Sequence, residues 1–287
     1  MATVAYASHE STEERTSRPV PTDLSTFRPS GPIVYLVPAL NEVDNLPRLF
    51  ADLESRPQLV PSSSSIVVID DGSDDGTAEL VESYDGSLPL KLIRFEQNQG
   101  PGSAFRAGFA AALEHCPLEG LIVTLEADTT SDLDSLPLML AHASYDADLV
   151  LASVHGGGRM LNVSAYRRLL SAGAGWFVRT LLGIDAQTVS SFFRVYRASL
   201  LHAALARYGD GLIREPGFAC KAELLVKLTA LGARVVEVPV DLDATRRIGK
   251  SRMKVTPTLM AYGRLMMRQR AEQPQTEQPA GTGALIA

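Results

Sequence analysis

The sequence predicts an α/β protein with a mostly parallel central sheet and helices on both faces. Short β-branched runs alternate with stretches of helical spacing, which is the pattern of a parallel sheet covered by its crossover helices. Polar, acidic or glycine-rich residues follow each of the first four runs, and ligands bind beyond the carboxyl ends of such strands. The length of 287 residues, with 45% hydrophobic and 21% charged residues, suits one compact domain.

The elements follow one another in a regular order along the chain. Five strands are expected at Ile33–Pro38, Ser65–Asp70, Leu90–Phe95, Leu121–Asp128 and Ala147–Ser153. Four helices are expected between them, at Val43–Glu54, Thr77–Tyr84, Gly102–Glu114 and Asp132–His142. A last helix is expected at Thr256–Arg270, because Thr256 and Pro257 are typical of a helix start.

The two ends of the chain differ in composition from the rest. Residues 1–30 are rich in Ser, Thr, Glu and Pro and lack periodicity, and residues 271–287 resemble them. Both are predicted to be disordered, which leaves one folded domain at residues 31–270. Two cysteines indicate neither a disulfide framework nor a zinc site. With no signal peptide and no apolar run of membrane-spanning length, a cytoplasmic protein is expected.

Several common function classes are disfavoured. The net charge of −6 provides no general argument for nucleic-acid binding. The glycines at 100–108 follow the wrong strand and lack GxGxxG spacing, and there is no Walker A motif. A dinucleotide-dependent oxidoreductase and a P-loop NTPase are therefore both disfavoured. Taken alone, Asp70-Asp71-Gly72-Ser73 is equally compatible with a turn that caps a helix.

The ordered set of motifs resembles family 2 glycosyltransferases with the GT-A (nucleotide-diphospho-sugar transferase) fold. The closest likeness is to the dolichyl-phosphate mannose synthase and polyprenyl-phosphate sugar transferase branch. The matching elements are PxxNE at Pro38–Glu42, DDGSxDxT at Asp70–Thr77, NxGxxxAxxxG at Asn98–Gly108, SSFFRVYR at Ser190–Arg197, AELLVKLTALGARVVEVPV at Ala222–Val240 and RRIGKSR at Arg246–Arg252. No single element is decisive, but their order is specific.

The resemblance implies a nucleotide-diphosphate-sugar donor of the GDP-mannose or UDP-glucose type. It assigns the nucleoside to Pro38, Leu40, Glu42, Val68 and Asp70, and a carboxylate can accept from base N–H groups or ribose hydroxyls. The diphosphate needs a cation, because negative charge builds on it as the sugar–phosphate bond breaks. Mg²⁺ or Mn²⁺ held by one or two carboxylates and phosphate oxygens is the expected arrangement.

The metal would be held at Glu126-Ala127-Asp128, where the family usually has DxD. Glu126 replaces the first Asp and keeps a hard oxygen ligand, while Asp128, generally the more direct ligand in the family, is intact. Ala127 is expected to contact the donor. The alternative is an acidic strand end in an inactive or differently tuned homologue, since the longer side chain can misplace a ligand.

Basic residues are expected to bind the phosphates. Arg168 is the candidate contact for the acceptor phosphate, with a solvated helix face as the alternative. The segment Arg246–Arg252 resembles the RxxGxSK loop of the synthases, with Arg252 in place of Lys. A mobile loop there would close over the diphosphate, with charge-assisted bonds from Arg246, Ser251 and Arg252. Eight basic and no acidic residues occupy positions 246–270, either as a solvated tail or as a region attracted to anionic lipid.

The predicted function is a metal-dependent, inverting transfer of a hexose to a polyprenyl or dolichyl phosphate, with Asp128, Arg168 and Arg246 as catalytic residues. A phosphate acceptor is already an anionic nucleophile, so positioning and charge stabilisation suffice. A hydroxyl acceptor would require a carboxylate base, and Glu215 and Glu223 are isolated in the sequence.

The last helix would either pack on the core or lie in the membrane plane. The second arrangement would give peripheral membrane contact at the cytoplasmic face. A hydroxyl-glycosylating enzyme and a silent nucleotide-sugar-binding protein remain as alternatives.

Overall fold

The structure of the protein is a computed structural model. It describes residues 20–21, 23–24, 27–61, 63–155, 157–163, 173, 175–176, 179–180, 183, 186–189, 191–249 and 255–272. Within these residues the main sheet contains β1 (Ile33–Ala39), β2 (Ser65–Asp70), β3 (Leu90–Arg94), β4 (Leu121–Thr124), β5 (Leu149–Ser153), β7 (Arg194–Arg197) and β8 (Val235–Pro239). Their order across the sheet is β3-β2-β1-β4-β7-β5-β8. A small second sheet pairs β6 (Met160–Leu161) with β9 (Leu242–Asp243).

The main sheet is parallel except at one strand. Strand β7 lies antiparallel between β4 and β5, with Val195 opposite both Val123 and Val150. The other strand pairs of this sheet run parallel, which confirms the expected mostly parallel sheet. The carboxyl ends of β1, β2 and β4 therefore meet at one edge.

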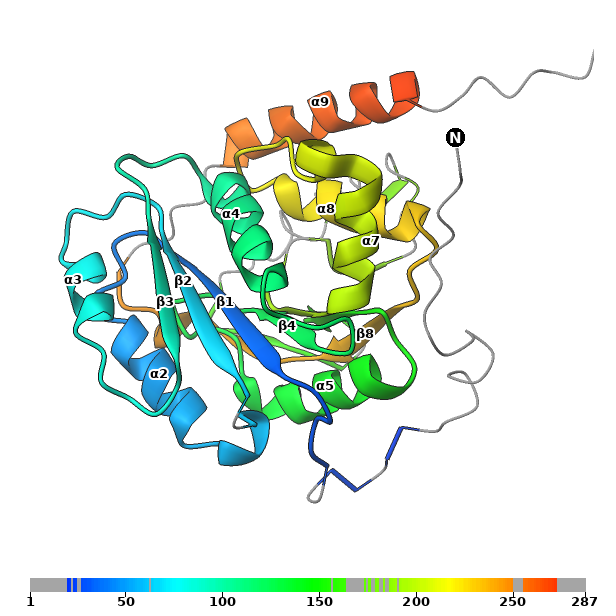
Figure 1. Cartoon of the computed structure of the whole chain (residues 1–287). Helices are drawn as coiled ribbons and strands as arrows, with labels where there is room; N and C mark the ends of the chain where they lie inside the picture. The colour runs from blue at the N-terminus through cyan, green and yellow to red at the C-terminus, as the bar shows by residue number, and fades with distance from the viewer. Residues whose placement is uncertain are drawn as a thin grey trace, which may run out of the picture.

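Helices cover both faces of the sheet (Figure 1). They are α2 (Leu46–Glu54), α3 (Thr77–Glu82), α4 (Pro101–Leu113), α5 (Leu136–Tyr145), α7 (Ala198–Tyr208), α8 (Cys220–Ala230) and α9 (Val255–Glu272), with short 3₁₀ turns η1 (Pro57–Leu59), η2 (Leu133–Ser135), η3 (Gly209–Leu212) and η4 (Ala244–Arg246). Residues of α4, α7, α8 and α9 form one core cluster with Leu36 and Ile122. Residues of α2 and α5 form the other with Tyr35 and Val123. Strands buried on both faces explain the continuous apolar runs in the sequence.

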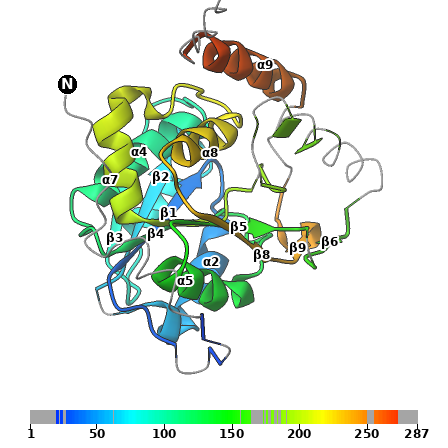
Figure 2. The same ribbon diagram turned by 90° about the vertical axis from the view of Figure 1, so that its right-hand side faces the viewer.

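Helix α9 packs across α8, on the face that also carries α4 and α7 (Figure 2). Ala261, Tyr262 and Leu265 are buried there, whereas Leu259 is 39% exposed. Of the two arrangements expected for this last helix, packing on the core is therefore the one seen at Ala261, Tyr262 and Leu265. Across the described part of the chain, α9 included, no helix has the length and apolarity needed to cross a membrane.

The fourth strand is shorter than predicted. It ends at Thr124, so that Glu126 and Asp128 lie in the following turn rather than on the strand. The Asp128 carboxylate accepts hydrogen bonds from the backbone N–H and the hydroxyl of Thr130. Such local side-chain bonds compete with the sheet ladder, and the positive φ of 57° at Thr129 turns the chain away from the sheet.

The domain boundaries stay a prediction. Residues 1–19 and 273–287 lie outside the described residues. Phe27, within the predicted leader, is buried, and its ring centroid lies 6.3 Å from that of Tyr145. The chain therefore already packs on the domain at Phe27, before the predicted start at residue 31.

Candidate functional site

The loops that follow β1 and β2 are joined by hydrogen bonds. Asn41 and Asp74 exchange two, from Asn41 Nδ2 to Asp74 Oδ1 at 2.7 Å and from Asp74 N to Asn41 Oδ1 at 3.0 Å. The backbone N–H of Glu42 donates to the hydroxyl of Thr77 at 2.9 Å. Asn41 has a positive φ of 54°, a conformation that asparagine tolerates. The PxxNE and DDGSxDxT motifs therefore form one structural unit.

Asp70, at the end of β2, is fully buried at this edge. Its Oδ1 accepts from the backbone N–H of Ser73 at 3.0 Å. Its Oδ2 has no hydrogen-bond partner within the described residues, and the nearest cation there is Arg94, with Nε at 3.8 Å. A buried acceptor of this kind fits a hydrogen bond from a ligand.

Asp71 has a different environment from its neighbour. Its two carboxylate oxygens accept from the backbone N–H groups of Gln99 and Gly100, at 2.7 and 2.9 Å. Burial raises the pKa of Asp71, and these two bonds oppose that shift. Asp71 therefore holds the loop that leads into α4. Gly72 is required beside it, because a Cβ there would lie 2.6 Å from the backbone of Gln97.

The turn after β4 presents two carboxylates. Asp128 is 5% exposed, and its Oδ1 accepts from the N–H and the hydroxyl of Thr130 at 3.0 and 2.8 Å. Glu126 is half-buried and accepts from the Ser131 hydroxyl at 2.8 Å. We call residues 126–131 the acidic turn.

A basic segment, residues 246–249, lies against the acidic turn, and we call it the basic loop. The guanidinium of Arg247 bonds Asp128 Oδ2. Arg246 lies between two further carboxylates, with Nη2 at 3.7 Å from Asp52 Oδ2 and Nη1 at 4.0 Å from Asp132 Oδ1. This segment therefore contributes two cations to the edge that carries the acidic turn.

Helix α2 holds the basic loop in place. Asn45, which is 2% exposed, donates to the Ile248 carbonyl at 3.0 Å and accepts from the Ile248 N–H at 3.1 Å. Arg48 donates to the Arg246 carbonyl at 2.5 Å. The expected mobile loop is thus anchored on α2 at its first residues, while its remainder at 250–254 lies outside the described residues.

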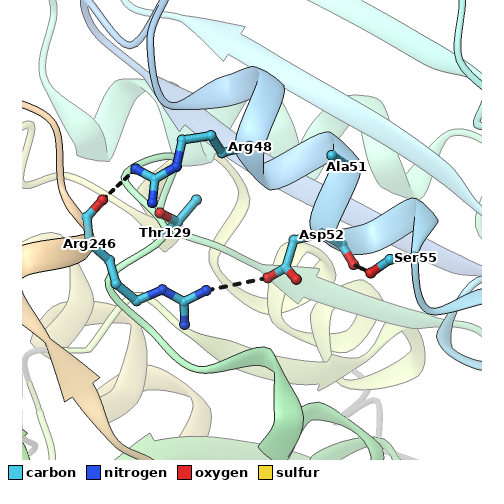
Figure 3. A pocket seen from close by; sticks show the side chains of 6 residues that line it. All are labelled: Arg48, Ala51, Asp52, Ser55, Thr129 and Arg246. Atoms are coloured by element: carbon cyan, nitrogen blue, oxygen red, sulfur yellow. Dashed lines mark hydrogen bonds and ion pairs between the residues drawn. The ribbon is translucent and has the colours of Figure 1, made fainter.

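A hollow of about 300 Å³ opens beside this contact (Figure 3). Its lining residues are Arg48, Ala51, Asp52, Ser55, Thr129 and Arg246. Arg246 reaches Asp52 across the hollow, and Thr129 belongs to the acidic turn. The residues assigned to the nucleoside are not among the lining residues, so this hollow flanks the predicted donor site rather than forming it.

The structure brings together most of the site residues predicted from the sequence. Pro38, Leu40, Glu42 and Asp70 lie at the carboxyl ends of β1 and β2, and Glu126, Asp128 and Arg246 lie at the acidic turn and basic loop. Val68 and Ala127 are buried in the hydrophobic core, at 0% and 4% exposure. Arg168, Ser251 and Arg252 fall outside the described residues.

Sequence reasoning missed Arg247, Asn45 and Lys221. The two adjacent arginines at 246 and 247 could have pointed to Arg247, but the motif match singled out Arg246. Nothing in the sequence pairs Asn45 with residue 248. Lys221, in the first turn of α8, is 6% exposed. Burial lowers the pKa of Lys221 to about 8, and the negative charge of Glu126 opposes this shift.

The donor atoms at the acidic turn fit a divalent cation only in part. Among the described residues, no three His, Cys, Asp or Glu side chains come together as a metal site. Glu126 and Asp128 supply hard carboxylate oxygens, which suit Mg²⁺ or Mn²⁺. The remaining ligands would have to come from a diphosphate or water, as expected for a cation that binds with its nucleotide.

Comparison with known proteins assigns the family. Residues 35–205 match the family model for glycosyl transferase family 2. The chain therefore belongs to glycosyl transferase family 2, and the expected enzyme class, a glycosyltransferase, is confirmed.

Two curated relatives are similar over most of their length. An undecaprenyl-phosphate mannosyltransferase of Micrococcus luteus is 29% identical over 77% of this chain and 87% of its own. A polyprenol monophosphomannose synthase of Mycolicibacterium smegmatis is 28% identical over 80% of this chain and 84% of its own.

The fold also has solved counterparts. Glucosyl-3-phosphoglycerate synthase from Mycobacterium tuberculosis, in complex with Mn²⁺, UDP and glucosyl-3-phosphoglycerate, superposes with a TM-score of 0.56 at 18% identity. The superposition covers 86% of this chain and 82% of that one. The predicted GT-A fold is thereby confirmed.

Proposed function

We propose that this protein transfers a hexose from a nucleotide-diphosphate sugar to a polyprenyl phosphate. The observation that carries the proposal is the opposition of the acidic turn and the basic loop, with Arg247 bonded to Asp128. A metal–diphosphate group needs carboxylates for its cation and basic side chains for its phosphates, and the acidic turn and the basic loop would supply both. The two relatives are named as an undecaprenyl-phosphate mannosyltransferase and a polyprenol monophosphomannose synthase, and these names support a polyprenyl phosphate as the acceptor.

The nucleoside would bind beyond β1 and β2, at Pro38, Leu40, Glu42 and Asp70. The Oδ2 of Asp70, which accepts no hydrogen bond from the described part of the chain, would accept one from a base or ribose donor. Val68 lies two residues before Asp70 and therefore on the same face of β2, where it would support the pocket from beneath. Ala127 would contact the donor between the two acidic residues.

Glu126 and Asp128 would hold Mg²⁺ or Mn²⁺ together with the donor diphosphate. The cation would stabilise the negative charge of the leaving nucleoside diphosphate. Because Arg247 bonds Asp128 in this structure, its guanidinium would move from the carboxylate to a phosphate oxygen. Arg246, Ser251 and Arg252 would supply further charge-assisted donors.

The acceptor phosphate would attack the sugar directly, in a single displacement that inverts the anomeric centre, with Arg168 as a phosphate contact. The structure supports an acceptor that needs no base. Glu215 pairs with Arg264 and Arg268, and Glu223 accepts from Lys227 at 2.6 Å. Both carboxylates are thus engaged in holding α8 and α9.

Peripheral membrane contact would come from α9. Met260 and Met267 are 63% and 70% exposed on this helix, which also carries Arg264 and Arg268. Exposed apolar side chains beside basic residues suit the surface of an anionic membrane, at the cytoplasmic face where we expect the protein to act.

A transfer assay tests the proposal. The full chain is incubated with Mn²⁺ or Mg²⁺, GDP-mannose or UDP-glucose, and undecaprenyl phosphate, and the lipid is analysed by mass spectrometry. We expect a glycosylated phospholipid that disappears in Asp128→Ala and persists in the control Asp134→Ala, whose side chain is 73% exposed. Donor hydrolysis without lipid product would favour a hydroxyl acceptor, and an intact donor would favour a silent binding protein.

A further inference from the structure

The hollow beside the basic loop is lined by a buried hydroxyl that the protein itself does not use. Thr129, in the acidic turn, is 6% exposed and lines this hollow (Figure 3). Its Oγ1 has no hydrogen-bond partner among the described residues. The positive φ of 57° at Thr129 is also an outlier for a β-branched residue. A buried polar atom without a partner calls for an explanation, and a ligand in the hollow would supply one.

The charged groups around the hollow attract one another but are too far apart to form hydrogen bonds. Arg246 Nη2 lies 3.7 Å from Asp52 Oδ2, and Arg246 Nη1 lies 4.0 Å from Asp132 Oδ1. Hydrogen bonds between nitrogen and oxygen span about 2.7–3.2 Å. The guanidinium therefore keeps donor capacity, and Asp52 Oδ2 keeps acceptor capacity, for a third group that can bond to both.

Arg48 adds a second guanidinium to the same hollow. Its Nη1 donates to the Arg246 carbonyl at 2.5 Å, and Arg48 is exposed where it lines the hollow. A guanidinium carries several N–H donors. The bond that holds the basic loop therefore leaves Arg48 able to donate to a ligand as well.

A neutral group with adjacent hydroxyls fits these contacts better than an ion does. An anion would be repelled by Asp52 and Asp132, and a cation would be repelled by Arg48 and Arg246. A hydroxyl, in contrast, accepts from a guanidinium through its oxygen and donates to a carboxylate through its hydrogen. The hollow of about 300 Å³ lies at the small end of ligand pockets, which span about 300–1,000 Å³. One sugar ring has this chemistry and suits this size.

The hollow adjoins the proposed metal–diphosphate site. Thr129 follows Asp128 in the chain and Arg246 precedes Arg247. The side chains of Asp128 and Arg247 are bonded to each other. A sugar joined to a diphosphate at the acidic turn would therefore be close to the residues that line the hollow.

We propose that the hollow binds the hydroxyls of a hexose, with Asp52 as an acceptor and with Thr129, Arg48 and Arg246 as donors. The assignment rests on the proposed function and deepens it, because the hexose of the nucleotide-sugar donor is the first candidate for this site. A separate carbohydrate carries the same hydroxyls, and binding measurements distinguish the two sources.

The first measurement isolates the contribution of the sugar to donor binding. GDP and GDP-mannose, or UDP and UDP-glucose, are titrated into the full chain with Mn²⁺ by calorimetry, without any lipid. Thr129→Val removes the hydroxyl and keeps the shape of the side chain. It is expected to lower the affinity for the nucleotide sugar by about threefold to tenfold while the affinity for the nucleotide stays unchanged. The free energy of unfolding should not fall, because this hydroxyl has no partner to lose.

Asp52→Asn provides a second variant, which is expected to lower the affinity for the nucleotide sugar by about tenfold. Its matched control is Asp134→Asn. Asp52 and Asp134 both pair with Arg56, but Asp134 is 73% exposed and does not line the hollow. If Asp52→Asn fails to fold, Thr129→Val carries the comparison alone.

The second measurement uses free mannose and free glucose, followed by saturation-transfer NMR with and without the nucleotide. A weaker signal in Thr129→Val, together with an unchanged affinity for the nucleotide sugar, would assign the hollow to the hexose of a separate carbohydrate. An unchanged response to nucleotide sugar and to free hexose in both variants would overturn the proposal. So would inorganic phosphate binding that Thr129→Val abolishes, because the ligand would then be an anion.

The inference and the proposed function fail in different ways. If the native protein transfers no sugar to undecaprenyl phosphate, the proposed function is wrong, and binding of free hexose still tests the hollow. If the native protein transfers sugar and both variants bind nucleotide sugar and free hexose as the native protein does, only the assignment of the hollow is wrong.

Discussion

Arg247 bonds the carboxylate of Asp128, a residue 119 positions earlier in the chain. In this arrangement an arginine side chain neutralises the carboxylate that is proposed to hold a metal ion. The guanidinium occupies part of the acceptor capacity of Asp128 and repels a second cation, so the contact weakens metal binding.

Arg247→Met is therefore expected to bind Mn²⁺ about threefold to tenfold more tightly than the native protein when nucleotide is absent, because Asp128 is released. With nucleotide present, the same variant should bind GDP or UDP more weakly, since a phosphate donor is lost. Calorimetry measures both affinities. Arg234→Met, which removes an exposed partner of Asp146, should change neither. An unaltered Mn²⁺ affinity in Arg247→Met would contradict the competition.

Asp70 and Asp71 are adjacent but should respond differently to the same substitution. Asp70→Asn turns the unused buried acceptor into a donor, so nucleotide affinity should fall by about tenfold or more. Stability should change little, because the remaining carbonyl can still accept from Ser73. A nucleotide affinity equal to that of the native protein would remove Asp70 from the binding site.

Asp71→Asn should act on folding. One of the two backbone N–H groups of Gln99 and Gly100 loses its acceptor, which costs about 1–3 kcal/mol in free energy of unfolding. Urea denaturation measures this loss. The folded fraction should bind nucleotide with an affinity close to that of the native protein, and a selective loss of affinity would instead place Asp71 in the site.

Asn45→Ala removes both hydrogen bonds to the Ile248 backbone. The expected loss is about 1–3 kcal/mol in free energy of unfolding, because each of the two hydrogen bonds contributes about 0.5–1.5 kcal/mol. Limited proteolysis should cut faster around Gly249 once the basic loop is released. Ser55→Ala, at the exposed C-cap of the same helix, should cost under about 0.5 kcal/mol. Equal cleavage rates in the two variants would show that Asn45 does not anchor the loop.

The two thiols should resist alkylation in the native protein. Burial raises the pKa of Cys116 to about 11 and that of Cys220 to about 12. At pH 8 both are therefore protonated, and the thiolate is the reactive form. Iodoacetamide followed by mass spectrometry should find them unmodified until denaturant is added. Rapid labelling of Cys220 without denaturant would show that the first turn of α8 opens.

Much of the fold was predictable, because strands that are buried on both faces appear in the sequence as continuous apolar runs. The second strand matches its predicted limits, and the residues expected at the carboxyl ends of β1 and β2 lie together. The fourth strand was overestimated, because the side-chain bonds of Asp128 to Thr130 end it early. A periodicity argument does not detect such bonds.

The contacts that complete the site were less predictable. Arg247 reaches Asp128 only because the chain returns to this edge after β9. Short runs such as Arg194–Arg197 carry no local information about which strands they join, so the antiparallel position of β7 was not foreseen. Motif matching located the acidic turn but not Arg247, which bonds it.

The position of β7 also bears on how the chain is made. Strand β5 pairs with β7 and β8, and both are later in the sequence. During synthesis the apolar β5 therefore leaves the ribosome with both of its edges unpaired, while β1 to β4 already have one another as partners. Unpaired strand edges favour aggregation. Nascent chains stopped before Arg194 should accordingly depend on chaperones more than the finished protein does.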